Sequence, residues 1–185
     1  MKRNSMLAAL LFALFPAAVL AQPVQWAGNG NYYEFVSSNV DWSTAFTAAN
    51  ASSHLGLSGY LATVTSAAEN AFLTSISTQL GWLGGSDAGG PVNAWTWRNG
   101  PENGQAFTFT NWNPGEPNDC CGGEDYLHTN FEVARGWNDH GATQLNGYFV
   151  EYSGSIVPEP SSYALMATGL FGVGATIRRR ARKIA

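Results

Sequence analysis

Basic residues are almost absent from the central part of this 185-residue sequence. Only Arg98 and Arg135 lie between Gln22 and Pro160, whereas all thirteen acidic residues fall in that interval, which therefore carries a formal charge of −11. The overall charge of −4 conceals this imbalance, because the other seven basic residues lie near the two ends. Nucleic-acid binding requires a basic surface, so this composition excludes it and favours the binding of cations.

Cysteine is also scarce, with only Cys120 and Cys121 in the whole chain. Two adjacent cysteines cannot supply the spaced disulfide framework on which many small exported domains depend. They can form a bridge with each other, pair with another chain or stay reduced, and the sequence does not decide among these states. Together with His128 and His140 they suggest zinc, but their spacing fits no common zinc pattern.

Signatures of catalysis are missing as well, because no Ser-His-acid order and no glycine-rich phosphate loop stands out. Glu124 and Asp139 offer the carboxylate pair of a glycosidase. A carboxylate that ligates a cation is held in its charged form and is a poor general acid, so metal binding is the better use of both residues. We therefore expect that the protein is not an enzyme.

The first 21 residues have the three parts of a secretory signal peptide. Lys2 and Arg3 form a charged start, residues 6–20 are apolar, and a small-residue cleavage site ends at Ala21. The apolar run is short for a membrane span and lacks a stop-transfer flank. We expect residues 1–21 to direct export and to take no part in the fold.

Residues 154–185 also have three parts: the motif Pro158-Glu159-Pro160, an apolar stretch over about 161–177 and a basic cluster at 178–183. This tail resembles the PEP-CTERM sorting signal of exported bacterial proteins. The resemblance implies recognition by an exosortase, cleavage near the motif and attachment to the membrane before processing. The apolar stretch is at the lower limit for crossing a bilayer, and the basic cluster would hold its end on the cytoplasmic side, so a permanent transmembrane anchor is the alternative.

The patterns between these two tails predict an α+β domain over residues 22–153. A cap at Asn39 or Asp41 opens one helix, in which apolar residues recur at i, i+3, i+4 and i+7. The capping box Ser66–Glu69 opens a second helix that reaches about Leu80. Alternating or β-branched and aromatic runs predict short strands at 31–36, 59–64, 81–85 and 148–152.

About fifty residues after the third predicted strand are rich in Gly, Asn, Pro and Trp and have little periodicity. Five Trp and Phe side chains within residues 95–112 argue that this long loop is ordered. Carboxylate and amide oxygens are the ligands that Ca²⁺ prefers, and clustered carboxylates repel one another unless a cation binds. An acidic, solvated surface loop is the alternative. The oxygen-bearing residues that suggest a cation site are Glu116, Asn118, Glu124, Asn138 and Asp139.

Several landmarks occur in a set order along residues 31–152. They are the tyrosine-rich first strand, Trp42, Gly59–Val64, Gly81–Gly85, Trp95-Thr96-Trp97, Asn111-Trp112, Glu116-Pro117-Asn118, Trp137-Asn138-Asp139 and Tyr148–Glu151. A lone Glu-Pro-Asn is a weak signal, but the ordered set is specific and resembles a C-type lectin-like domain. The resemblance implies the C-type lectin-like fold: two helices, small antiparallel sheets and a long ordered loop that binds calcium.

The same resemblance implies a ligand set. One Ca²⁺ would be held by Glu116, Asn118, Glu124, Asn138 and Asp139, and a sugar would bind through Glu116, Asn118, Glu124 and Asn138. Two neighbouring hydroxyls of the sugar would complete the coordination of the ion. Glu-Pro-Asn implies mannose-, glucose- or fucose-type sugars and a cis bond before the proline. A second metal site is implied at Asp87, Asn93, Asp119 and Asp125, although Asn93 stands where an acid is more usual.

The sequence departs from the family at its two framework disulfides. One pair of cysteines would fall near Ala49 and Val150, and the other near Tyr126 and Ala142. Each missing bridge forfeits about 2–5 kcal/mol of stability. We therefore expect the core and the bound Ca²⁺ to carry more of the stability.

These inferences predict a calcium-dependent carbohydrate-binding module on the cell surface or in the exopolysaccharide matrix of a bacterium. The alternative is a structural or protein-binding domain of the same fold in which Ca²⁺ only stabilises the loop, because many members of the family do not bind sugar. Trp112 and Trp137 are expected to pack in the core rather than to contact a ligand.

Overall fold

Strand β9 (Asn146–Tyr152) is the centre of the fold in the computed structural model, which describes residues 22–153. One edge of β9 pairs antiparallel with β2 (Tyr32–Val40) along nearly its whole length. The other edge is shared by β4 (Leu57–Leu61), which pairs antiparallel with the end of β9, and β5 (Gly81–Ser86), which pairs parallel with its start. Segments far apart in the sequence therefore meet on one strand.

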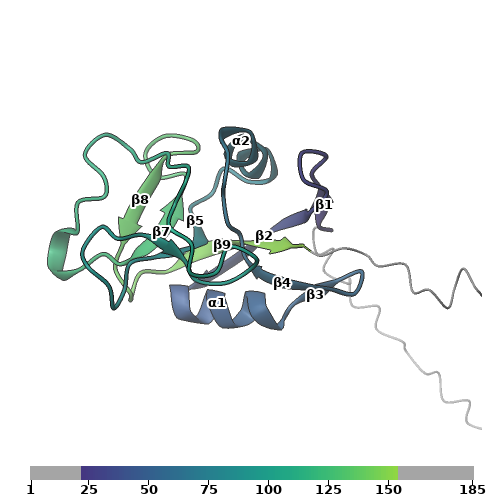
Figure 1. The fold of residues 1–185 in the computed structure, drawn as a ribbon, viewed down its shortest axis with the longest axis horizontal. Helices are drawn as coiled ribbons and strands as arrows, with labels where there is room; N and C mark the ends of the chain where they lie inside the picture. The colour runs from purple at the N-terminus through teal and green to yellow at the C-terminus, as the bar shows by residue number, and fades with distance from the viewer. Residues whose placement is uncertain (1–21, 154–185) are drawn as a thin grey trace, which may run out of the picture.

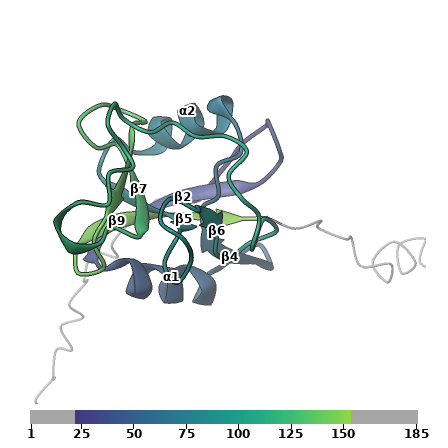
Figure 2. The same cartoon turned by 60° about the vertical axis from the view of Figure 1, so that its left-hand side comes forward.

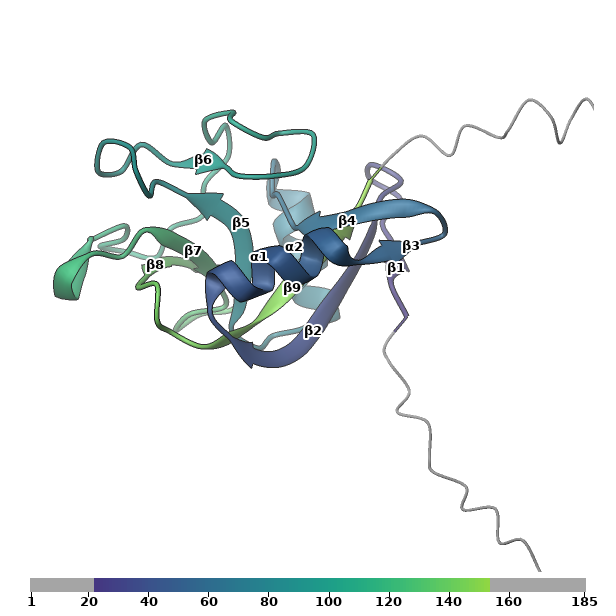
Figure 3. The same ribbon diagram turned by 90° about the horizontal axis from the view of Figure 1, so that it is seen from below.

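The remaining strands extend this sheet at its margins. The path runs β1-β2-β9-β5-β7-β8, with β3 on β4 and β6 on β5. The region from β5 to β8 forms the end of the domain that lies away from β1 and β3 (Figure 1 and Figure 3). The bounds of these elements are β1 Val24–Gln25, β3 Ser53–His54, β6 Thr96–Trp97, β7 Tyr126–Thr129 and β8 Trp137–His140, with a short 3-10 turn, η1, at Cys120–Gly122.

The two helices cover opposite faces of the sheet, as Figure 1 and Figure 2 both show. Side chains alternate across β9, so Phe149 packs in the core beneath α2 (Ala67–Ile76) and Val150 packs in the core beneath α1 (Trp42–Ala51). Both cores are rich in aromatic rings. A sheet covered by one helix on each face confirms the predicted α+β class and explains why β9 is buried on both faces.

Most predicted elements are found, with differences at their ends. Asp41 caps α1 by accepting from the Thr44 N–H at 2.7 Å. The second helix ends at Ile76 rather than near Leu80, because Ser77 turns to an extended conformation and the chain must reach β5. The Asn130 amide donates to the Ser77 carbonyl at 3.1 Å and holds this exit in place.

The predicted capping box is only half formed. Ser66 accepts from the Glu69 N–H at 3.2 Å as expected, but the Glu69 carboxylate turns toward Tyr33 and Thr65 instead of the Ser66 backbone. Glu69 is 2% exposed. A buried carboxylate takes the partners that the tertiary structure offers, so local spacing alone did not reveal its role.

Two of the four positions where framework cysteines are missing have become core. Ala49 and Val150 are buried in the same cluster, so an apolar contact stands in place of the first bridge. Tyr126 is half-buried and its ring lies 4.8 Å from that of Trp42. Ala142 is exposed, so the second pair has no equivalent contact. Trp137 is fully buried, which confirms its expected place in the core, whereas Trp112 is half-buried and only packs against that core.

The predicted signal peptide and sorting tail, at 1–21 and 154–185, lie outside the described residues. Among residues 22–153, no helix combines the length and apolar character that a membrane span requires.

A buried acidic network links β2, α2 and β9. The Tyr33 hydroxyl donates to Glu69 at 2.6 Å and lies 3.1 Å from Glu151, whose other oxygen accepts from the Thr63 N–H at 3.1 Å. Burial, and then the nearby Glu69 charge, raise the pKa of Glu151 to about 7 from its ordinary 4.5. One phenolic proton cannot serve two carboxylates, so a protonated Glu151 completes the network.

This network predicts a pH-dependent stability. Because the folded state binds the Glu151 proton more tightly than the unfolded chain, its contribution is fully present below pH 4.5 and is lost as the pH rises through about 7. The loss amounts to about 3 kcal/mol at 1.36 kcal/mol per pKa unit. Urea unfolding of the purified chain in chelator should therefore show a fall in free energy from pH 5 to pH 8, and Glu151→Gln should remove that part of it.

Glu132→Gln is the matched control, because Glu132 is exposed. The Glu132→Gln variant should show the same fall in unfolding free energy from pH 5 to pH 8 as the unchanged chain. The same fall in free energy for Glu151→Gln as for Glu132→Gln would show that Glu151 is not the titrating group.

Candidate metal centre

The candidate ligands come from two segments that the sheet brings together. Asn138 and Asp139 lie on β8, opposite His128 and Leu127 of β7, and both are at least 95% buried. The loop that carries Glu116 is tied to the start of β8, because the Asn113 N–H donates to the Trp137 carbonyl at 2.9 Å. Pairing of β7 with β8 therefore fixes Asn138 and Asp139 in the buried sheet, and the Asn113 hydrogen bond holds the Glu116 loop beside them.

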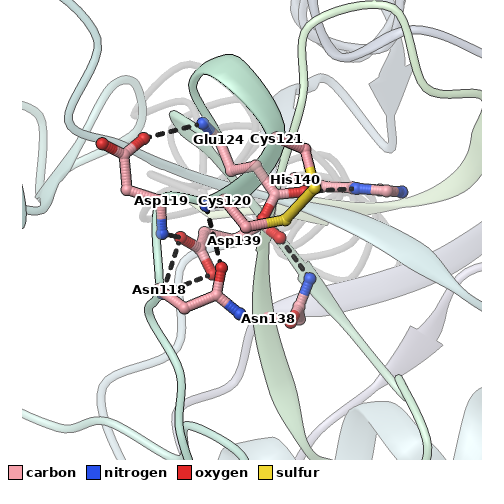
Figure 4. The surroundings of a disulfide bond; sticks show 8 residues. All are labelled: Asn118, Asp119, Cys120, Cys121, Glu124, Asn138, Asp139 and His140. Atoms are coloured by element: carbon pink, nitrogen blue, oxygen red, sulfur yellow. Dashed lines mark hydrogen bonds and ion pairs between the residues drawn. A yellow bond between two sulfur atoms is a disulfide. The ribbon is translucent and has the colours of Figure 1, made fainter.

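Asp139 is the point at which the loop meets the strand (Figure 4). Its carboxylate accepts from the Asn118 N–H at 3.0 and 3.2 Å and from the Asp119 N–H at 2.7 Å. Three hydrogen bonds to one fully buried carboxylate fix the backbone that follows Pro117. The Glu116–Pro117 bond is cis, as predicted.

Glu116 lies against this carboxylate. One of its oxygens, Oε2, is buried and has no hydrogen-bond partner among the described residues. Burial, then Asp139, Glu124 and Glu132, raise the pKa of Glu116 to about 6. Burial and neighbouring acids both disfavour the charged form of a carboxylate, and a cation placed among them would favour it. The residues present therefore fit a divalent cation.

Glu124 is the third carboxylate. Its side chain is 11% exposed, its Oε1 lies 3.4 Å from Nδ1 of His140, and its backbone N–H donates to Asp119 at 3.0 Å. The loop between Asp119 and Glu124 contains η1, in which Cys120 and Cys121 form a vicinal disulfide. The structure thus selects one of the three cysteine states that the sequence left open. Neither sulfur is a thiolate in this bridge, so the zinc alternative loses two of its four ligands.

The two amides are held differently. The side-chain oxygen of Asn118 accepts from the Cys120 N–H at 2.9 Å, whereas that of Asn138 accepts no hydrogen bond within residues 22–153. The Asn138 amide nitrogen lies 3.1 Å from Nε2 of His128. Burial lowers the pKa of His128 to about 3, so its ring is neutral and Nε2 can accept from Asn138. The Asn138 oxygen is thereby turned away from the histidine.

Histidine, cysteine, aspartate and glutamate do not by themselves define a metal centre in the part of the chain that the structure describes, since no three of them are close enough. A site here requires the amide oxygens of Asn118 and Asn138 beside the carboxylates. Mixed carboxylate and amide oxygen ligands suit Ca²⁺ rather than a transition metal.

The second predicted metal group is only partly assembled. Asp87 accepts from the Asn93 backbone N–H at 2.7 Å, so the backbone of Asn93, not its side chain, makes the contact. The other Asp87 oxygen is buried without a partner, and burial, then Asp125 and Asp119, raise the pKa of Asp87. The charges of Asp125 and Asp119 thus act on Asp87, but among the described residues no three such side chains are close enough to hold a metal, so a second metal at Asp87, Asn93, Asp119 and Asp125 stays a prediction.

Sequence patterns missed the supporting residues of the site. Asp119, predicted as a ligand of the second metal, also accepts from the Glu124 N–H, while His128 orients Asn138 and His140 packs beside Glu124. The His128 and His140 rings stack at 4.7 Å. The register of β7 and β8 pairs His128 with Asn138 and Tyr126 with His140, so the two histidines are diagonal neighbours on one face, and this register is not visible in the sequence.

Comparison with known proteins agrees with this fold. The chain is 42% identical over 137 residues to halomucin of Haloquadratum walsbyi, an alignment that covers 69% of this chain and 2% of halomucin. It is 32% identical over 125 residues to human C-type lectin domain family 10 member A, covering 63% of this chain and 35% of that protein. The chain thus spans only a small part of the length of either relative.

Solved structures show the same architecture. The cow CD23 carbohydrate-recognition domain, determined in the presence of a GlcNAc2Man3 oligosaccharide, is 26% identical with a TM-score of 0.54, over 68% of this chain and 89% of that one. A Ca²⁺-dependent type II antifreeze protein in its Ca²⁺-free form is 25% identical with a TM-score of 0.59, over 71% and 97%. Residues 22–153 therefore have the C-type lectin-like fold.

The tail is identified separately. Residues 157–180 match the PEP-CTERM protein-sorting motif. The chain thus combines the C-type lectin-like fold with a PEP-CTERM sorting motif, and this motif indicates export and surface sorting.

The acidic cluster predicts an unusual response to charge removal. Glu116→Gln should raise the melting temperature of the purified chain in chelator, because it removes one of two carboxylates that repel each other, and should abolish stabilisation by added Ca²⁺. Differential scanning fluorimetry with and without Ca²⁺ measures both effects. Glu132→Gln, which removes a charge from an exposed position nearby, should leave the Ca²⁺ response intact; an intact response in Glu116→Gln would exclude Glu116 as a ligand.

Proposed function

We propose that this protein is a calcium-dependent carbohydrate-binding module that recognises mannose-, glucose- or fucose-type sugars outside the cell. The observation that carries the proposal is the meeting of Glu116 and Asp139 beside Glu124, with a buried Glu116 oxygen that has no partner. Such an arrangement is unfavourable for the protein alone and favourable with a divalent cation. The fold and the carbohydrate-recognition domains that share it support the same reading.

The chemistry follows from the types of ligand atom. Ca²⁺ would be held by Glu116, Asn118, Glu124, Asn138 and Asp139, and when bound it would supply open coordination positions to two neighbouring sugar hydroxyls. Each hydroxyl can donate to a carboxylate and accept from an amide N–H. Glu116 and Glu124 provide acceptors and Asn118 provides a donor for a vicinal diol. The two N–H groups of Asn138 already point at Nε2 of His128 and the Asp139 carbonyl, so Asn138 would have to release one of them to donate to the second hydroxyl.

A structural role is the second candidate, and one observation favours it. The Asn118 oxygen and both Asp139 oxygens already accept backbone hydrogen bonds, so the loop closes on itself without sugar. A Ca²⁺-dependent protein with this fold can also be an antifreeze protein. In this case Ca²⁺ would raise stability and sugar would not.

The setting of the activity is also part of the proposal. The sorting motif supports processing by an exosortase, membrane attachment through the tail before processing, and a final place at the cell surface or in an exopolysaccharide matrix. We propose a non-enzymatic role, because Glu124 and Asp139, the two acids able to form a glycosidase pair, would serve as cation ligands, and a carboxylate that ligates a cation is a poor general acid.

A sugar titration separates the two candidates. With Ca²⁺ present, methyl α-mannoside or methyl α-glucoside at about one hundred times its Kd should add roughly 2.7 kcal/mol to the unfolding free energy. Chelator should abolish that gain. Asn118→Ala should abolish it too, because the variant loses both a ligand oxygen and an amide donor.

Asn103→Ala is the matched control, since Asn103 is exposed and its side chain makes no hydrogen bond within residues 22–153. It should respond to sugar like the unchanged chain. Stabilisation by Ca²⁺ with no response to methyl α-mannoside, methyl α-glucoside or methyl α-fucoside would favour the structural role, and sugar binding that persists in excess chelator would refute the calcium dependence.

A further inference from the structure

A groove with aromatic walls lies beside the candidate metal centre. It encloses about 570 Å³, within the range of small-molecule sites, and its walls include Trp95, Phe107 and Trp112. The Trp95 and Trp112 ring centres are 5.0 Å apart, and those of Phe107 and Trp112 are 6.4 Å apart. Trp95 is 6% exposed, while the other two rings are half-buried, so part of this aromatic surface faces solvent.

The groove approaches the proposed sugar site at one residue. Pro117, between Glu116 and Asn118, is one of its lining residues. Trp112 bridges to Trp137, the residue before Asn138. A single sugar at the metal centre would not reach this groove. An oligosaccharide that extended past Pro117 could place its next sugar residue against the aromatic wall.

The polar groups of the groove suit a neutral ligand. No lining residue is ionisable, although the surrounding domain is strongly acidic. The side chains of Asn93 and Thr110 line the groove, are exposed and make no hydrogen bond within residues 22–153. The indole Nε1 of Trp95 is buried without an acceptor.

These features match one chemical class. A sugar ring presents C–H groups on its faces and hydroxyls at its edge, so it can cover aromatic rings while its hydroxyls bond to Asn93 and Thr110. An anionic ligand would find no cation here and would be repelled by the acidic domain. A purely apolar chain would leave the free amide and hydroxyl groups unused.

We propose that this groove is a second subsite, which binds a neutral sugar residue linked to the one held at the metal centre. The proposal rests on the proposed function and adds to it that the preferred ligand is an oligosaccharide rather than a terminal sugar alone. The chain would then read two neighbouring residues of a glycan, one through oxygen ligands and one through aromatic contact.

The test compares monosaccharides with oligosaccharides by calorimetry on the purified chain with Ca²⁺. Methyl α-mannoside and methyl α-glucoside are set against trisaccharides of the same sugars with different linkages. At least one trisaccharide should bind about tenfold more tightly than its monosaccharide, a difference of about 1.4 kcal/mol. Three residues offer only about a threefold statistical gain, so a larger gain reports the subsite.

Ala106→Trp is the blocking variant, because Ala106 is exposed and lines the groove. It should lose the trisaccharide gain and keep monosaccharide affinity within about twofold. Ala51→Trp places the same ring on the exposed end of α1, away from the lining residues, and should keep both affinities. Thr110→Ala, a smaller change that cannot overfill the groove, should lose about threefold of the gain.

Each other outcome overturns the inference in a recognisable way. Monosaccharide binding without a trisaccharide gain, or a gain that survives both Ala106→Trp and Thr110→Ala, refutes the subsite and leaves the proposed function standing. A gain for octyl mannoside over methyl mannoside that Ala106→Trp removes, without a trisaccharide gain, assigns the groove to an apolar chain instead. No binding of any monosaccharide refutes the proposed function and the subsite with it.

Discussion

The hydrogen bonds from the Asn118 and Asp119 backbone to Asp139 are the interaction on which the candidate site depends. They join a loop without regular structure to a buried strand, and so hold that loop in one conformation. Asp139 can do this because it is fully buried on β8 and its position is set by pairing with β7. The same carboxylate also lies next to Glu116 and disfavours the charged form of Glu116. Positioning and cation attraction thus arise from one residue.

The sheet and its two cores stabilise the domain in the absence of the framework disulfides. β9 buries both of its faces, and two aromatic cores under two helices meet there. Ala49 and Val150 show how an apolar contact can occupy a place where the family has a disulfide. Burial on both faces also has a cost, because Glu151 falls on the α2 side and must be accommodated by Tyr33, Asn31 and Thr63. A network of hydrogen bonds meets that cost.

Much of the fold could be predicted from local patterns. Helix α1 and its Asp41 cap follow from short-range spacing, and so do the positions of β5 and β9, because periodicity and capping depend on residues within one or two turns. The end of α2 and the partner of Glu69 could not be predicted in this way. Both depend on residues more than thirty positions away, namely Asn130 for the helix exit and Tyr33 for the carboxylate.

The sequence by itself determined which oxygen-bearing residues are available, the negative charge of the domain, the order of its landmarks and the presence of a sorting tail. These are properties of composition and of neighbours along the chain. Only the tertiary structure decided that Glu116 meets Asp139, that His128 turns the Asn138 amide, that the cysteines bridge each other, and that Trp95, Phe107 and Trp112 enclose a groove. Contacts of this kind depend on how strands pair and how loops close over them, which no local pattern specifies.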